Sequence, residues 1–217
     1  MEFADLEKLI RTRRSVRKWQ SKPVSEEMLL KAIELATWAP NAGNQQNWRF
    51  YVIINRGIIE SMAKANQHIA DEVASWLDAE QQQAMATRWR ESAGVFRSAP
   101  AVIGVVASQY QSPPDKVLAT RGKTDVKAEQ IRDWRNAADS RIQSVAAAVG
   151  YLLLIFHQMG LGTVWMTGPM QAKGELERIL HVPQGMDLVA LIPVGYPDES
   201  PSPKERKPVK EVCEIVR

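Results

Sequence analysis

Cysteine is nearly absent from this chain of 217 residues, in which Cys213 is the only example. A single cysteine cannot form an intrachain disulfide, so the sequence excludes a secreted fold that disulfide bonds hold together. Long apolar runs are missing too, because the longest, residues 145–156, falls short of the roughly 20 residues that cross a bilayer. The first residues carry acidic side chains where an export signal needs basic ones. We therefore expect a cytoplasmic protein that does not associate with membranes.

Motifs for metal binding and nucleophilic catalysis are missing as well. The three histidines, His68, His157 and His181, are scattered without metal-ligand spacing, so we expect no metal site. The sequence contains neither a Gly-x-Ser-x-Gly elbow nor a Gly-x-x-x-x-Gly-Lys phosphate loop. Cys213 has no clear base beside it, and we interpret it as a passive apolar residue. No catalytic side chain is therefore predicted.

Charge of one sign is only in slight excess, since 28 basic and 25 acidic residues give a net charge of +3. The one compact basic run, Arg11 to Lys18, is short enough to serve a single phosphate group rather than a polymer. We therefore expect no nucleic-acid partner. The length and the ordinary hydrophobic content predict one domain over residues 1–217.

Helical and strand patterns alternate along the chain, which predicts an α+β or α/β fold in three layers. Helices are expected at residues 5–11, 26–36, over most of 58–94, from about 127, at 142–159 as a buried core helix, and at 175–180. Apolar, β-branched runs predict strands at residues 48–54, 101–107, 163–166 and 188–194.

Two segments rich in proline interrupt this pattern. Residues 109–127 contain Pro113, Pro114 and Gly122, and we predict a loop or insertion there. Residues 197–217 contain four further prolines and should run over a surface. Within this tail, residues 209–216 alternate enough to predict an edge strand that pairs with a partner subunit.

Two segments of the first half carry groups that suit a ligand. Three guanidinium groups and a hydroxyl lie within residues 13–17 and could hold a phosphate, although a solvated basic face is the alternative. Residues 39–48 form a loop dense in amides, which could match a ring edge that alternates C=O and N–H groups. A turn that caps the preceding helix is the alternative for this loop.

Two segments of the second half are also candidates. Gly168 follows a short strand and could let backbone N–H groups approach a planar ring, although a helix stop followed by a loop is the alternative for residues 160–169. The cations of residues 204–207 could close on a phosphate, or they could be solvated surface. Trp76, Trp89 and Trp134 are interpreted as packing residues, although one of them could line an acceptor pocket.

Taken together and in this order, the four segments resemble the nitroreductase family of flavoproteins over nearly the whole chain. The resemblance implies an α+β fold with helices on both faces of a central, mainly antiparallel mixed sheet. It also implies bound FMN, NADH or NADPH as electron donor, a small-molecule acceptor, and a homodimer whose flavin sites both subunits build. The C-terminal strand and tail would wrap around the partner.

The resemblance carries family roles onto individual residues of this chain. The residues implied to bind FMN phosphate and ribityl are Arg13, Arg14, Ser15, Arg17, Lys204 and Arg206. Arg17 would lie nearest flavin N1 and the C2 carbonyl. The loop residues implied to reach the flavin of the partner subunit are Asn41, Ala42, Asn44 and Gln46. The backbone at Thr167 and Gly168 would approach flavin N5 and O4.

The chain departs from the family pattern at four positions. Asn41 replaces a serine and Asn47 a proline of the loop, which puts the preferred substrate in doubt. Thr167 stands where some relatives carry an acid, and Ser144 stands where many carry Asp. The implied activity is ping-pong electron transfer from NAD(P)H through FMN to a nitroaromatic, a quinone or a similar flat acceptor. A reductive dehalogenase, a flavin-fragmenting enzyme and a non-catalytic flavin-binding module are the alternatives.

Overall fold

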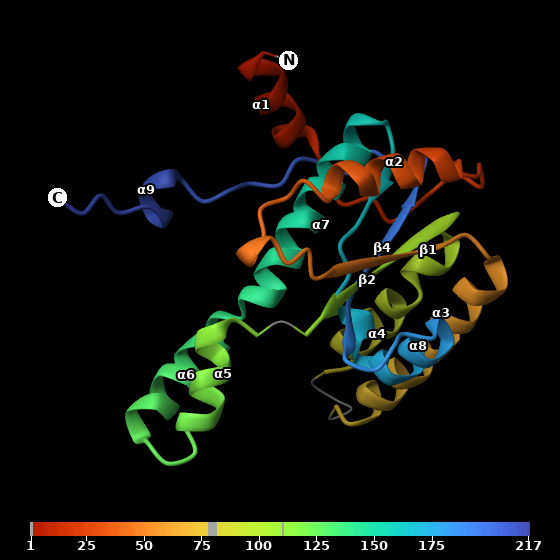
Figure 1. Cartoon of the computed structure of the whole chain (residues 1–217). Helices are drawn as coiled ribbons and strands as arrows, with labels where there is room; N and C mark the ends of the chain where they lie inside the picture. Colours follow the sequence, from red (N-terminus) through yellow and green to blue (C-terminus); the bar gives the residue numbers. More distant parts are fainter. Residues whose placement is uncertain (1, 78–81, 110) are drawn as a thin grey trace.

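The computed structural model describes residues 2–77, 82–109 and 111–217, and it places helices on both faces of one sheet (Figure 1). The strands are β1 (Trp48–Ile53), β2 (Ala101–Ser108), β3 (Gly162–Thr163) and β4 (Met186–Gly195), in the order β1-β2-β4-β3. All three strand pairs are antiparallel, and one isolated parallel bridge joins Ser15 to Thr163. The predicted α+β fold with a mainly antiparallel sheet is confirmed.

The first face of the sheet is covered by α2 (Glu26–Ala36) and α7 (Ser140–Gln158). Ile103 and Val105 of β2 point to this face, whereas Val102 and Val106 belong to the core of the other face. This alternation follows from the two-residue period of a strand, and it explains why β2 is apolar at nearly every position. The core helix predicted at residues 142–159 is therefore α7, which lies against the centre of the sheet.

The second face is covered by α3 (Arg56–Ser75) and α8 (Lys173–Leu180), and α4 (Gln83–Ala93) packs on α3. Short 3-10 segments, η2 (Val95–Ser98) and η3 (Gly168–Ala172), connect this layer to β2 and α8. Phe96 is fully buried in this second core. The predicted helical region 58–94 thus contains two helices, and residues 78–81 of it lie outside the described residues.

Of the two alternatives predicted for residues 109–127, a loop or an insertion, the loop is wrong. The segment forms α5 (Pro113–Arg121), which packs on α6 (Val126–Ala138) in a hairpin that projects from the body of the protein (Figure 1). Proline breaks a helix interior but is favoured in the first turn, where its missing N–H costs no hydrogen bond. Ser112 and Asp115 complete a capping box around the two prolines, and Gly122 lies at the C-cap.

The edge strand predicted at residues 209–216 is also wrong in this structure, where Val209–Val212 forms the short helix α9. A strand needs a neighbour to pair with, and the described chain offers none at the end of this exposed tail. The tail leaves the body and extends away from it (Figure 1). Residues 126–158 are long and apolar enough for a membrane span by composition alone, but left-handed Asp139 divides them into α6 and the buried α7.

Candidate ligand-binding site

The basic run begins in the last turn of α1 (Phe3–Thr12), and the part that follows this helix is hydrogen-bonded to β3. The backbone N–H of Val16 donates to the carbonyl of Thr163 at 2.9 Å, and the indole of Trp19 donates to the carbonyl of Gly162 at 2.8 Å. A Cβ added to Gly162 would lie 2.7 Å from a Val16 methyl carbon, so only glycine permits this approach. Ser15 pairs with Thr163 at the same place. The sheet therefore fixes the backbone of residues 15–19.

The segment that follows β4 is hydrogen-bonded to the same basic run from the other side. The backbone N–H of Asp198 donates to the carbonyl of Lys18 at 2.9 Å. The Glu199 carboxylate accepts the backbone N–H groups of Arg17, at 2.5 Å, and of Lys18, at 3.2 Å. No pattern in the sequence pointed to Glu199, because its partners lie some 180 residues away along the chain. These contacts hold the beginning of the C-terminal tail beside the N-terminal basic run.

As a consequence, cations from both ends of the chain line one pocket of about 630 Å³. They are Arg11, Arg13, Arg14, Lys204 and Arg206. Glu7 also lines the pocket, and its carboxylate is paired with Arg11 at 2.7 Å. Among the described residues, none of the other four cations forms an ion pair. Burial lowers the pKa of Arg13, and the charges of Arg14 and Arg206 lower it further. Four cations that repel one another and have no carboxylate partner among the described residues make this pocket suited to an anion.

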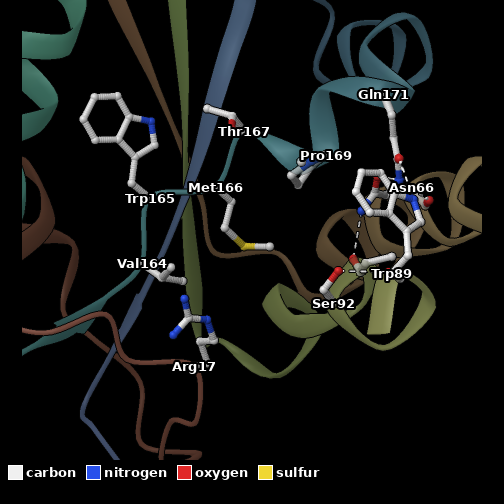
Figure 2. Close-up of a pocket in the computed structure, with 12 residues that line it drawn as sticks. Arg17, Asn66, Trp89, Ser92, Val164, Trp165, Met166, Thr167, Pro169 and Gln171 are labelled. Carbon is white, nitrogen blue, oxygen red and sulfur yellow. Dashed lines mark hydrogen bonds between the residues drawn. The ribbon is translucent and has the colours of Figure 1, made fainter. Parts of the chain in front are cut away.

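A second pocket, of about 270 Å³, contains Arg17, Thr167 and Gly168 (Figure 2). A Cβ added to Gly168 would meet no atom within 4 Å, so the backbone there faces open space. Trp89 of α4, Asn66 of α3 and the polar residues Ser92 and Gln171 form the opposite wall. The arrangement suits a planar group that needs both charge and backbone contacts.

The amide-rich loop is held against the first turns of α7. The backbone N–H of Ala42, in η1 (Ala42–Asn44), donates to the hydroxyl of Ser144 at 3.1 Å. The amide of buried Asn47 donates to the carbonyl of Arg141 at 3.2 Å. Asn44 and Gln46 adopt left-handed backbone angles, with φ of 51° and 46°, and both are exposed. Ser144, at one of the positions that depart from the family pattern, therefore positions the loop.

The loop and the cation pocket lie at opposite ends of α7. Ser144 holds the loop, whereas His157 contacts Thr12 at 2.9 Å, next to Arg13. Thirteen residues separate Ser144 from His157, which is about 20 Å along a helix that rises 1.5 Å per residue. No residue of the loop is among the described residues that line either pocket. Within one chain, the structure does not bring Asn41, Ala42, Asn44 and Gln46 to the other predicted site residues.

His157 should report directly on an anion in the cation pocket. Burial lowers its pKa from 6.5, and the charges of Arg13 and Arg14 lower it further. A bound phosphate dianion offsets these two charges, so the pKa of His157 should rise when inorganic phosphate or FMN binds. NMR titration of the imidazole, with and without the anion, measures this change. The signals of His68, on α3, and of His181, at the end of α8, serve as references, and an unchanged His157 pKa at saturating anion would contradict the assignment.

Comparison with known proteins identifies the family of this chain. The sequence profile of the nitroreductase family matches residues 10–196. The chain belongs to the nitroreductase family. An NADH dehydrogenase of Thermus thermophilus is 29% identical over 206 residues, which cover 92% of this chain and 90% of that protein. The match begins just before the basic run and ends at Tyr196, so the tail with Lys204 and Arg206 lies beyond it.

Solved structures show the same nitroreductase-like fold. The crystal structure of a BluB-like flavoprotein from Clostridium difficile has a TM-score of 0.86 and 27% identity, with each chain covered completely. The structure of an oxidised iodotyrosine deiodinase bound to FMN and 3-iodo-L-tyrosine has a TM-score of 0.71 and 23% identity. The match covers 98% of this chain and 97% of the deiodinase chain.

Proposed function

We propose that this nitroreductase-family protein is an FMN-dependent oxidoreductase that transfers electrons from NADH or NADPH to a small, flat, electron-poor acceptor such as a nitroaromatic or a quinone. The observation that carries the proposal is the meeting of Arg13 and Arg14 with Lys204 and Arg206 in one pocket. Four cations without a carboxylate partner among the described residues suit a phosphate dianion. The solved relative with bound FMN supports the same cofactor.

The two pockets fit the two ends of FMN. Arg13 lines the cation pocket and Arg17 lines the pocket that contains Gly168. The four-residue step between them spans about 13 Å in extended backbone, at roughly 3.3 Å per residue. The mononucleotide would therefore run along the basic run, with its phosphate at Arg13 and its ring between Arg17 and Gly168. The open space at Gly168 gives the ring room to approach the backbone.

When bound, FMN would supply a ring that accepts hydride from the nicotinamide and passes electrons to the acceptor. The chain's own residues would hold and tune that ring. Arg17 places positive charge where the reduced ring gains negative charge. Thr167 offers no acidic side chain, so solvent or the ribityl hydroxyls would supply protons. These roles account for a site without a catalytic pair, and they agree with ping-pong kinetics in which donor and acceptor use the same open face.

We propose further that the protein is a homodimer in which each flavin site takes its amide loop from the partner. Three features of the single chain support this. The loop lies at the far end of α7 from the cation pocket. The apolar residues Phe3 and Ile10 of α1 are exposed, at 79% and 54%. Residues 202–217 of the tail are exposed throughout, which leaves them free to wrap around a second subunit.

A specialised reaction is the second candidate. The likeness to a BluB-like flavoprotein and to an iodotyrosine deiodinase favours a flavin-fragmenting or reductively dehalogenating enzyme. The projecting α5–α6 hairpin is the part of this chain that could adapt the site to such a substrate. Product analysis after incubation of FMN-loaded, reduced protein with oxygen, or with a halogenated phenol, distinguishes these reactions from reduction of nitroaromatics and quinones.

One absorbance experiment tests cofactor and reaction class together. The purified protein should carry the yellow spectrum of oxidised flavin, which bleaches anaerobically when NADH or NADPH is added and returns when a quinone follows. The reductive step should proceed without the acceptor, because ping-pong transfer separates the two halves. Bound flavin that neither nicotinamide reduces would instead indicate a non-catalytic flavin-binding module, and a protein that binds no FMN would refute the proposal.

A further inference from the structure

A chain of hydrogen bonds holds one aromatic side chain at the edge of the Gly168 pocket. The indole N–H of Trp89 donates to Oε1 of Gln171 at 3.2 Å. Nε2 of Gln171 donates to Oδ1 of Asn66 at 3.0 Å, and Nδ2 of Asn66 donates to the carbonyl of Ala93 at 2.8 Å. Asn66 is only 1% exposed, so the chain ends in the protein interior. Three helical segments, α4, η3 and α3, contribute to it (Figure 2).

The direction of this chain is fixed by the indole. A tryptophan N–H can only donate, so Gln171 must present its oxygen to Trp89 and its amino group to Asn66. Asn66 in turn must accept from Gln171 and donate to the backbone of α4. The side-chain amides of Gln171 and Asn66 therefore both use their hydrogen bonds to hold the indole of Trp89 in place. Gln171 lies three residues after Gly168 on η3, so the same short segment sets the backbone of the pocket and the position of the indole.

Trp89 itself is not a core residue. Its side chain is 42% exposed and lines the pocket across from Arg17 (Figure 2). An aromatic ring that stays partly exposed while the half-buried amide of Gln171 fixes its N–H presents its remaining surface to the pocket. Trp165 also lines the pocket and is 40% exposed, but its indole lies on the other side of its segment from Trp89 in Figure 2.

We propose that Trp89 is a ring-binding residue: it packs against the planar heteroaromatic ring of the flavin bound between Arg17 and Gly168, and Gln171 positions it. The proposal rests on the proposed function, since it concerns the ring end of the same site. It assigns ring recognition to α4 and η3, apart from phosphate recognition by the two ends of the chain. Loss of Trp89 should consequently weaken every flavin alike, whether or not it carries a phosphate.

Affinities of wild-type and variant apoprotein for FMN and for riboflavin, measured by flavin fluorescence, test this. Trp89→Ala should weaken both flavins by the same factor, about tenfold for loss of one aromatic contact. Trp89→Phe, which keeps a ring, should stay within about threefold of wild type. Trp76→Ala is the matched control, since Trp76 is 71% exposed and lies outside the pocket. Far-UV circular dichroism of each variant verifies the fold.

Gln171→Leu tests the positioning role. It should weaken both flavins several-fold in the wild-type background and have no further effect in Trp89→Ala, because Gln171 acts through the indole. Additive losses would overturn the positioning role, and unchanged riboflavin affinity in Trp89→Ala would overturn the ring contact. In either case wild-type protein still binds FMN, so these failures differ from failure of the proposed function, in which wild type binds neither flavin.

Discussion

Replacing Arg13 or Arg206 with alanine is expected to weaken FMN binding by about 2 kcal/mol each, roughly a thirtyfold rise in Kd, because each change removes a charge-assisted contact to the phosphate. The double variant should purify without flavin. Riboflavin affinity should be unchanged in all three, because riboflavin lacks the phosphate that these side chains would contact. Isothermal titration of the apoproteins with both flavins measures the two effects side by side.

The controls for this prediction come from the same two segments. Lys18 and Lys207 carry the same charge close to Arg13 and Arg206 in sequence, but neither lines the cation pocket. Lys18→Ala and Lys207→Ala should therefore change FMN affinity only through long-range charge, by a few tenths of a kcal/mol that salt screens. Equal losses in Lys207→Ala and Arg206→Ala would mean that the tail attracts FMN by net charge alone, and the pocket would lose its assigned ligand.

Local patterns predicted most of the fold. Burial on two sides produces the continuous apolar runs of β2 and β4 and the apolar faces of α7. Such runs can be recognised directly in the sequence. The prediction for residues 113–121 failed because proline has two opposite effects on a helix. It breaks the helix when it lies in the interior, and it favours the start of the helix when it lies in the first turn. The prediction of a terminal strand failed because strand pairing depends on a neighbouring strand that the sequence of one chain does not specify.

The sequence predicted only part of the candidate site, for a related reason. Residues 13–17 and 204–206 stood out as charge clusters, and the resemblance joined them, but their meeting depends on Glu199 and on the close approach at Gly162. Trp89 was one of three equivalent tryptophans in the sequence. What distinguishes it, the amide of Gln171, lies 82 residues away. Contacts of this kind leave no periodicity, so only the folded structure identifies them.

Mixing two defective variants should restore FMN binding if each site takes its cations from one subunit and its amide loop from the other. One variant is Arg13→Ala/Arg206→Ala. The other, Asn44→Gly/Gln46→Gly, removes two exposed amides at positions whose left-handed φ glycine accepts without strain. After unfolding and joint refolding at equal concentrations, half of the dimers should be mixed, each with one intact site. About one quarter of the wild-type FMN capacity should then return.

The reciprocal mixture should lower FMN binding instead of restoring it. It therefore distinguishes flavin sites that two subunits share from flavin sites that one chain builds. When wild type is refolded with a chain that carries all four substitutions, every mixed dimer pairs an intact half-site with a defective one. Shared sites therefore predict that high-affinity FMN binding in the mixed dimers is lost, although half of their subunits are wild type. Sites built within one chain predict that each wild-type subunit keeps its flavin and that the first mixture restores nothing. The distance of about 20 Å along α7 between the loop and the cation pocket makes the shared outcome the expected one.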